Sequence, residues 1–98
     1  MLSMNTTYSF LPKTPGEIQQ LIAERIRMIR RRRKISQKRL SELSGVSLGS
    51  VKRFERSGEI SFLSLIKITF ALGLNKELEH LFEEVPPLSM EEIIRGQD

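Results

Sequence analysis

Residues 37–55 read QKRLSELSGVSLGSVKRFE, and this stretch decides the fold. Ser36 is a candidate N-cap for a short helix that ends at Gly45, and Ser47 caps the next helix after only one intervening residue. Two short helices joined by so small a turn must cross steeply, which is the helix-turn-helix geometry. The apolar residues predicted to hold the two helices together from inside are Leu40, Leu43, Val46, Val51 and Phe54.

The polar and small residues of the second helix of this pair are expected to face outward. In the helix-turn-helix geometry this second helix can lie in a DNA major groove. Small residues near its start let the backbone approach base edges, while Lys52 and Arg53 have the reach and the donors for guanine O6/N7 or phosphate. Ser47 acts first as a helix cap, and Glu55 is predicted to pair locally rather than to touch DNA. The candidate DNA-contacting residues are Gln37, Ser47, Leu48, Gly49, Ser50, Lys52 and Arg53.

The pattern over about residues 20 to 74 resembles the XRE, or phage-repressor-like (lambda repressor-like), helix-turn-helix family. The resemblance rests on Gln37, Leu40-Ser41, Gly45-Val46-Ser47, Val51, Phe54-Glu55, Gly58 and Ala71-Leu72-Gly73-Leu74, all in register. It implies a five-helix DNA-binding domain that acts as a dimer on palindromic operators. It also implies a phosphate contact from Gln37 and base contacts from Ser47, Leu48, Gly49 and Arg53.

The recognition helix departs from the glutamine-rich helices of phage repressors. Leu48 and Gly49 cannot make bidentate amide contacts to adenine. Base reading should therefore depend on Arg53, Lys52 and Ser50, on a thymine-methyl contact from Leu48, and on DNA shape.

Helix signals on both sides of this segment predict an all-α chain. Thr14-Pro15-Gly16-Glu17 starts a helix of about 17 residues with an apolar stripe of Ile18, Ile22, Ile26 and Ile29. A helix over about 62–72 is apolar almost all round and is expected to be the central buried helix. Another helix is expected over about 75–84, before Pro86-Pro87, and Ser89-Met90-Glu91-Glu92 could start a short final helix. The predicted organisation is a loose arm at 1–13, a compact five-helix domain at 14–85 with its helix-turn-helix at about 37–57, and a tail at 86–98.

The formal net charge of +4 is distributed unevenly along the 98 residues. Residues 24–56 carry twelve Lys and Arg against three Glu, whereas residues 57–98 carry three bases against eight acids. A basic surface suits a polyanion, because Lys and Arg neutralise phosphates and release condensed counterions; a solvated helix face is the alternative. The run from Arg30 to Lys34 should supply at least one phosphate contact. The candidate DNA-backbone residues are Arg32, Arg33, Lys34, Lys38 and Arg56.

Composition argues against several other classes. With no Cys and one His there is no disulfide framework and no thiolate zinc site, and no metal or cofactor is expected. His80 is expected to be a partly exposed surface residue, and the pairs Glu83-Glu84 and Glu91-Glu92 to be helix-surface acids. No apolar stretch approaches the roughly 20 residues that span a bilayer, and no signal peptide is read, so a cytoplasmic location is expected. An enzyme is the weakest hypothesis, since no phosphate-binding glycine loop or nucleophile–base pair is visible.

The leading hypothesis is a sequence-specific repressor that binds double-stranded DNA as a homodimer. A lone domain with a short tail (Leu81 to Leu88) resembles the HipB-type antitoxins, which bind their own operator and a HipA-like kinase toxin. The alternatives are a generic phage-type regulator without a toxin, and an adaptor whose acidic C-terminal half binds a partner protein.

Overall fold

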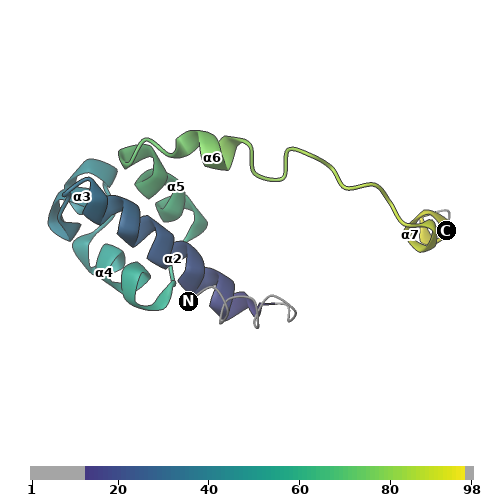
Figure 1. The fold of residues 1–98 in the computed structure, drawn as a ribbon, viewed down its shortest axis with the longest axis horizontal. Helices are drawn as coiled ribbons and strands as arrows, with labels where there is room; N and C mark the ends of the chain where they lie inside the picture. Colours follow the sequence, from purple (N-terminus) through teal and green to yellow (C-terminus); the bar gives the residue numbers. More distant parts are fainter. Residues whose placement is uncertain (1–12, 97–98) are drawn as a thin grey trace.

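The computed structural model describes residues 13–96, and throughout that range it contains helices and no strand. The helices are α2 (Pro15–Arg32), α3 (Gln37–Ser44), α4 (Leu48–Ser57), α5 (Phe62–Ala71), α6 (Asn75–Glu79) and α7 (Met90–Arg95). Helices α2 to α6 form the body of the molecule, while α7 stands apart at the end of an extended segment (Figure 1). The predicted all-α class, with five helices and a short C-terminal one, is confirmed. The predicted arm at 1–13 lies outside the described residues apart from Lys13.

The predicted starts of α2, α3, α4 and α7 are confirmed, and at each one a side chain encoded in the local sequence caps the helix. Thr14 begins α2 with a capping box: its hydroxyl accepts from the Glu17 N–H at 3.2 Å, and the Glu17 carboxylate accepts from the Thr14 N–H at 2.8 Å. Ser36 and Ser47 cap α3 and α4, and Ser89 forms a second capping box at α7. These caps satisfy N–H groups that have no partner inside the helix.

A small core joins α2, α3, α4 and one side of α5. Helix α2 packs against α4, and α3 packs against both α4 and α5. The predicted isoleucine stripe is wrong in its N-terminal half, because Ile18 and Ile22 are 45% and 37% exposed. The buried residues of α2 are Ala23, Ile26 and Arg30, so the first turns of the helix stay outside the core. The buried apolar residues are Ala23, Ile26, Leu40, Val46, Val51, Phe54, Ile68 and Leu72.

Helix α5 is not the central buried helix that its composition predicts. Phe62, Leu63 and Phe70 are each more than 60% exposed, and within the helix only Ile68 and Thr69 are buried. The helix packs against α3 on one side and α6 at its end, so the remaining apolar surface has no neighbour in the described chain. An all-round apolar composition therefore signals an unpartnered face here rather than a central position.

The expected helix over 75–84 is also wrong in length, since α6 ends at Glu79. Phe82 has a left-handed backbone (φ 59°) that a helix cannot continue. Every residue from 80 to 96 is exposed, so Leu81 and Phe82 gain no burial that would favour another helical turn. In residues 13–96 no helix has the length and apolarity needed to cross a membrane.

Candidate nucleic-acid interface

The turn between α3 and α4 is held by a short series of hydrogen bonds. Gly45 ends α3 in the left-handed region (φ 76°), where glycine carries no Cβ penalty. The Ser41 hydroxyl donates to the Val46 carbonyl at 2.6 Å, and the Val46 N–H donates to the Ser44 hydroxyl at 3.1 Å. Ser47 then accepts from the Ser50 N–H at 3.1 Å and starts α4. The turn therefore fixes the direction of α4 relative to α3.

The inside of the pair is mostly as predicted. Leu40, Val46, Val51 and Phe54 are almost completely buried. Leu43 was expected among them but is 45% exposed, because α3 is only eight residues long and turns Leu40 rather than Leu43 toward the core. The buried residues leave the opposite side of α4 to solvent.

That outward side of α4 carries the candidate base-contacting residues. Ser47, Gly49, Ser50, Lys52 and Arg53 are exposed, and Leu48 is half-buried. A Cβ added at Gly49 would meet nothing within 4 Å, so the first turn of α4 presents bare backbone. The geometry permits the close approach to base edges that small residues at this position predict.

A buried ion pair joins α2 to the inner side of α4. The Arg30 guanidinium donates from Nε to Glu55 Oε2 at 2.7 Å and from Nη2 to Oε1 at 2.8 Å, with side chains only 10% and 3% exposed. Arg30 Nη1 donates to the Ile35 carbonyl at 2.7 Å, and Gln37 Nε2 donates to Glu55 Oε1 at 3.0 Å. Every polar group of the pair is satisfied, which is the condition for tolerating buried charges. Glu55 was predicted to pair locally; it does pair, but the prediction is wrong in the partner, because Arg30 lies 25 residues away in the sequence.

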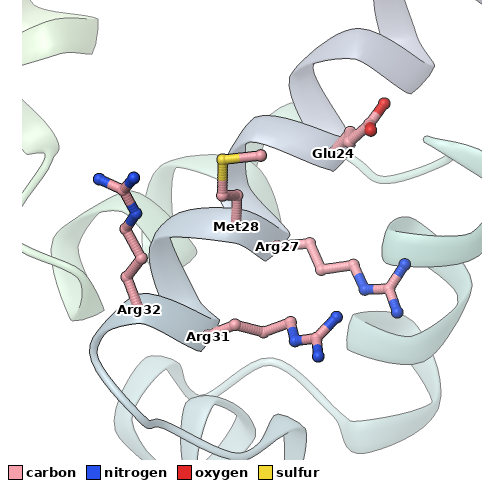
Figure 2. A pocket seen from close by; sticks show the side chains of 5 residues that line it. All are labelled: Glu24, Arg27, Met28, Arg31 and Arg32. Atoms are coloured by element: carbon pink, nitrogen blue, oxygen red, sulfur yellow. The ribbon is translucent and has the colours of Figure 1, made fainter.

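A basic groove of about 560 Å³ is shared between α2, the start of α3 and α4. Of its cations, sequence reasoning missed Arg27 and named Arg31 only as a member of the run from Arg30 to Lys34. Arg27 and Arg31 project from the same side of α2, whereas Arg32 points the other way (Figure 2). The groove also contains Ser36 and Gln37 at the N-terminus of α3, and Lys52 and Arg56 from α4. The i, i+4 spacing of Arg27 and Arg31 could have identified them as one face. Cations beside a helix N-terminus make this groove suited to phosphate.

The predicted DNA-backbone cations do not all gather in this groove. Arg56 lines it, and Lys38 is exposed on the first turn of α3. Arg33 donates from Nη1 to the Leu72 carbonyl and so joins the end of α2 to the end of α5. Lys34 follows α2 with a left-handed backbone (φ 57°), an unusual conformation for a residue other than glycine. Phosphate contacts from Arg32, Arg33, Lys34, Lys38 and Arg56 stay predictions.

The acidic C-terminal part offers no comparable site. His80 is exposed and pairs with Glu83, so the prediction of a surface histidine is confirmed. Glu91 and Glu92 are exposed as predicted, and backbone and hydroxyl hydrogen bonds from Ser89 lower the pKa of Glu92. Among residues 13–96 no group of three or more His, Asp or Glu side chains is placed to hold a metal ion.

Comparison with known proteins agrees with this geometry. A family model described as Helix-turn-helix matches residues 26–78, which is just over half of the chain and includes α3, α4 and the basic groove. No curated protein and no solved structure matches the chain significantly. The chain therefore belongs to the helix-turn-helix family of XRE, or phage-repressor-like, type, whose members are DNA-binding transcription regulators.

Proposed function

We propose that this protein is a sequence-specific repressor that binds double-stranded DNA with α4 in the major groove. The observation that carries the proposal is the arrangement of α4: its outward residues are small or cationic, and the basic groove with Arg27, Arg31, Lys52 and Arg56 lies beside it. In this orientation the groove cations meet phosphates while Arg53 and Ser50 meet base edges. Phosphate contacts then supply affinity, and base contacts supply selectivity.

The test is a fluorescence-anisotropy titration against the DNA upstream of the protein's own gene and against random duplex, over a range of salt. Arg53→Ala should weaken selective binding by about 1–3 kcal/mol through the loss of a base contact. Lys52→Ala removes a groove cation, so it should weaken binding to both duplexes and reduce the slope of log affinity against log salt by about 1. Arg95→Ala is the matched control, because it removes the same charge from α7, which stands away from the body (Figure 1). Binding without steep salt dependence and without preference over random DNA would contradict the proposal.

We further propose that the DNA-bound form is a homodimer on a palindromic operator. Support comes from the exposed apolar residues Phe62, Leu63 and Phe70 on α5, which a second copy could cover. A two-fold dimer would place two α4 helices about 34 Å apart, one helical turn of DNA. Sedimentation equilibrium with a palindromic duplex should give two chains per duplex, and one chain per duplex at saturation would count against the dimer.

The antitoxin role is a finer proposal, supported by the C-terminal extension. Residues 80–96 are all exposed and carry Leu81, Phe82, Val85 and Leu88, a set of apolar side chains available to a partner protein. By the resemblance to HipB-type antitoxins, that partner would be a HipA-like kinase toxin. Removing residues 81–98, which carry all four side chains, should abolish binding of a neighbouring-gene kinase and leave DNA binding intact. If the wild-type protein binds the partner but no DNA, and Arg53→Ala leaves partner binding unchanged, the adaptor hypothesis is favoured instead.

A further inference from the structure

Arg53 is held by a carboxylate that the sequence pattern did not single out. Its Nε donates to Glu59 Oε1 at 3.0 Å, and its Nη2 lies 3.0 Å from the same oxygen. The two side chains are 64% and 58% exposed, so both are accessible to a ligand. Glu59 comes directly after Gly58, the C-cap of α4, and lies three residues beyond Arg56.

The backbone around Gly58 fixes the position of Glu59. The Ser57 hydroxyl donates to the Arg53 carbonyl at 2.8 Å and accepts from the Glu59 N–H at 3.2 Å. Gly58 has φ 84° and donates to the Phe54 carbonyl at 2.7 Å. A Cβ at Gly58 would lie 2.9 Å from the Gln19 backbone, so this turn is packed directly on α2. The carboxylate is thus presented to Arg53 by a turn that the rest of the domain holds in place.

Glu59 occupies one edge of the guanidinium, and this decides which N–H donors of Arg53 remain available to a ligand. Nε and Nη2 form one edge of the planar group, and the terminal edge is formed by Nη1 with the second N–H of Nη2. No hydrogen bond from residues 13–96 is recorded at Nη1. A terminal edge with two parallel N–H donors matches guanine O6 and N7, the commonest specific arginine contact in the major groove.

We propose that Glu59 is a positioning residue that holds Arg53 by its Nε edge and presents the terminal edge to a guanine of the operator. This inference rests on the proposed DNA-binding function and adds to it the identity of one base and the residue that sets its selectivity. Glu59 itself carries a negative charge close to the DNA, so it lowers affinity for phosphate in general. Its benefit lies in discrimination between bases.

The experiment begins with selection of a binding site from a random duplex library by the full chain. Affinities are then measured by anisotropy for the selected duplex and for variants at each guanine. Wild-type protein should discriminate at least about fivefold at one guanine, and Arg53→Ala should lose discrimination at that position. Glu59→Ala should reduce it by roughly two- to fivefold while binding random duplex as tightly as the wild type or more tightly. Glu59→Gln, which keeps an acceptor oxygen, should retain most of the discrimination.

A matched control is available on α3. Glu42 accepts from Arg39 Nη1 at 3.3 Å in another exposed pair, with side chains 52% and 59% exposed. Glu42→Ala removes the same charge, so it should strengthen binding to random duplex without changing discrimination at the guanine that Arg53 reads. In the Arg53→Ala background, Glu59→Ala should have no further effect at that base.

Two results distinguish a failure of the positioning role of Glu59 from a failure of the proposed DNA-binding function. If the wild type enriches a sequence but Glu59→Ala leaves discrimination at the Arg53 position unchanged, or weakens it equally at every position, the positioning role is wrong. If the wild type enriches no sequence, the proposed function fails and the inference fails with it. Circular dichroism of each variant establishes that the fold is retained.

Discussion

Helix α4 contributes one residue to each of two arginine–glutamate pairs. The two pairs differ in their burial and in how many guanidinium nitrogens they use. On the inner side Glu55 meets Arg30 with side chains 3% and 10% exposed, and Nε, Nη1 and Nη2 of the guanidinium are all hydrogen-bonded. On the outer side Arg53 meets Glu59 with side chains 64% and 58% exposed, and only one edge of the guanidinium is used. The inner guanidinium is buried with every nitrogen engaged, whereas the outer one keeps three of its five N–H donors for a ligand.

The energetic consequences of breaking the two pairs should differ as much as their exposure. Removing one member of a buried pair leaves an uncompensated charge, which typically costs about 3–5 kcal/mol. Removing one member of an exposed pair costs less than about 1 kcal/mol. The inner side of α4 should therefore govern the free energy of unfolding, and the outer side should govern DNA binding.

The largest expected effect comes from breaking the inner pair. Glu55→Ala leaves Arg30 buried without its carboxylate, and we expect the free energy of unfolding to fall by about 3–5 kcal/mol. Glu59→Ala should lower it by less than about 1 kcal/mol. Urea unfolding followed by far-UV circular dichroism measures both. If both variants lose the same free energy of unfolding, burial does not determine how much each pair contributes to stability.

The next effect concerns two glycines that share a left-handed backbone but not their surroundings. A Cβ at Gly45 (φ 76°) meets open space, while a Cβ at Gly58 (φ 84°) lies 2.9 Å from Gln19. Gly45→Ala should cost about 1 kcal/mol from backbone strain. Gly58→Ala adds overpacking and should cost roughly 2–4 kcal/mol, and it should disturb the outer pair because Glu59 follows directly. Thermal and urea unfolding of the two variants provide the comparison, which fails if Gly45→Ala is the more destabilising.

Lys34 offers a way to test whether stability and binding are separable at one residue. Its φ of 57° costs energy that glycine would not incur, so Lys34→Gly should stabilise the domain by about 0.5–1 kcal/mol. If Lys34 contacts phosphate, the same change should reduce the slope of log affinity against log salt by about 1. Lys34→Asn is the control, since asparagine tolerates this backbone without the charge and should show the same loss of slope. A stabilised variant with unchanged slope would remove Lys34 from the interface.

The smallest expected effect is the pH dependence of an exposed cap. Hydrogen bonds from Thr14 lower the pKa of Glu17, and the bond from the backbone N–H contributes more than the bond with the hydroxyl. A folded-state pKa below the unfolded value means that the cap's stabilisation is complete above the ordinary glutamate pKa. It is lost as the pH falls from the ordinary glutamate pKa through the lowered value. Glu17→Gln should therefore flatten the decline of the unfolding midpoint in that range.

Glu92 is the control for this last prediction, because its pKa is lowered in the same way by Ser89. It caps α7, in which no residue is buried, so Glu92→Gln should leave the unfolding midpoint of the body unchanged at every pH. A shift equal to that of Glu17→Gln would indicate that α7 packs on the body in solution.

The features that sequence reasoning predicted are those encoded within a few residues. Thr14, Ser36 and Ser47 cap their helices because a cap depends only on the following turn. The turn at Gly45 and the buried Val51 and Phe54 follow from equally short patterns. These local signals were enough to place α3 and α4 and hence most of the candidate interface.

Burial and long-range pairing could not be predicted from short sequence patterns. The exposure of Phe62 and Phe70 depends on which helices happen to cover α5, and the burial of Arg30 depends on Glu55, 25 residues later. A run of five cations gives no sign that its first member faces inward. Pairing across helices also explains why Glu59 was not recognised, since nothing in its neighbourhood marks it as the partner of Arg53.

The open space at Gly49 has a consequence for how this protein could acquire new operators. No described atom lies within 4 Å of a Cβ added there, and glycine is the least favourable ordinary helix residue after proline. Almost any side chain can therefore replace it without disturbing the core, and most would stabilise α4. If α4 lies in the major groove as proposed, a side chain placed at position 49 would face the bases, so substitutions there should change target preference while the fold stays the same.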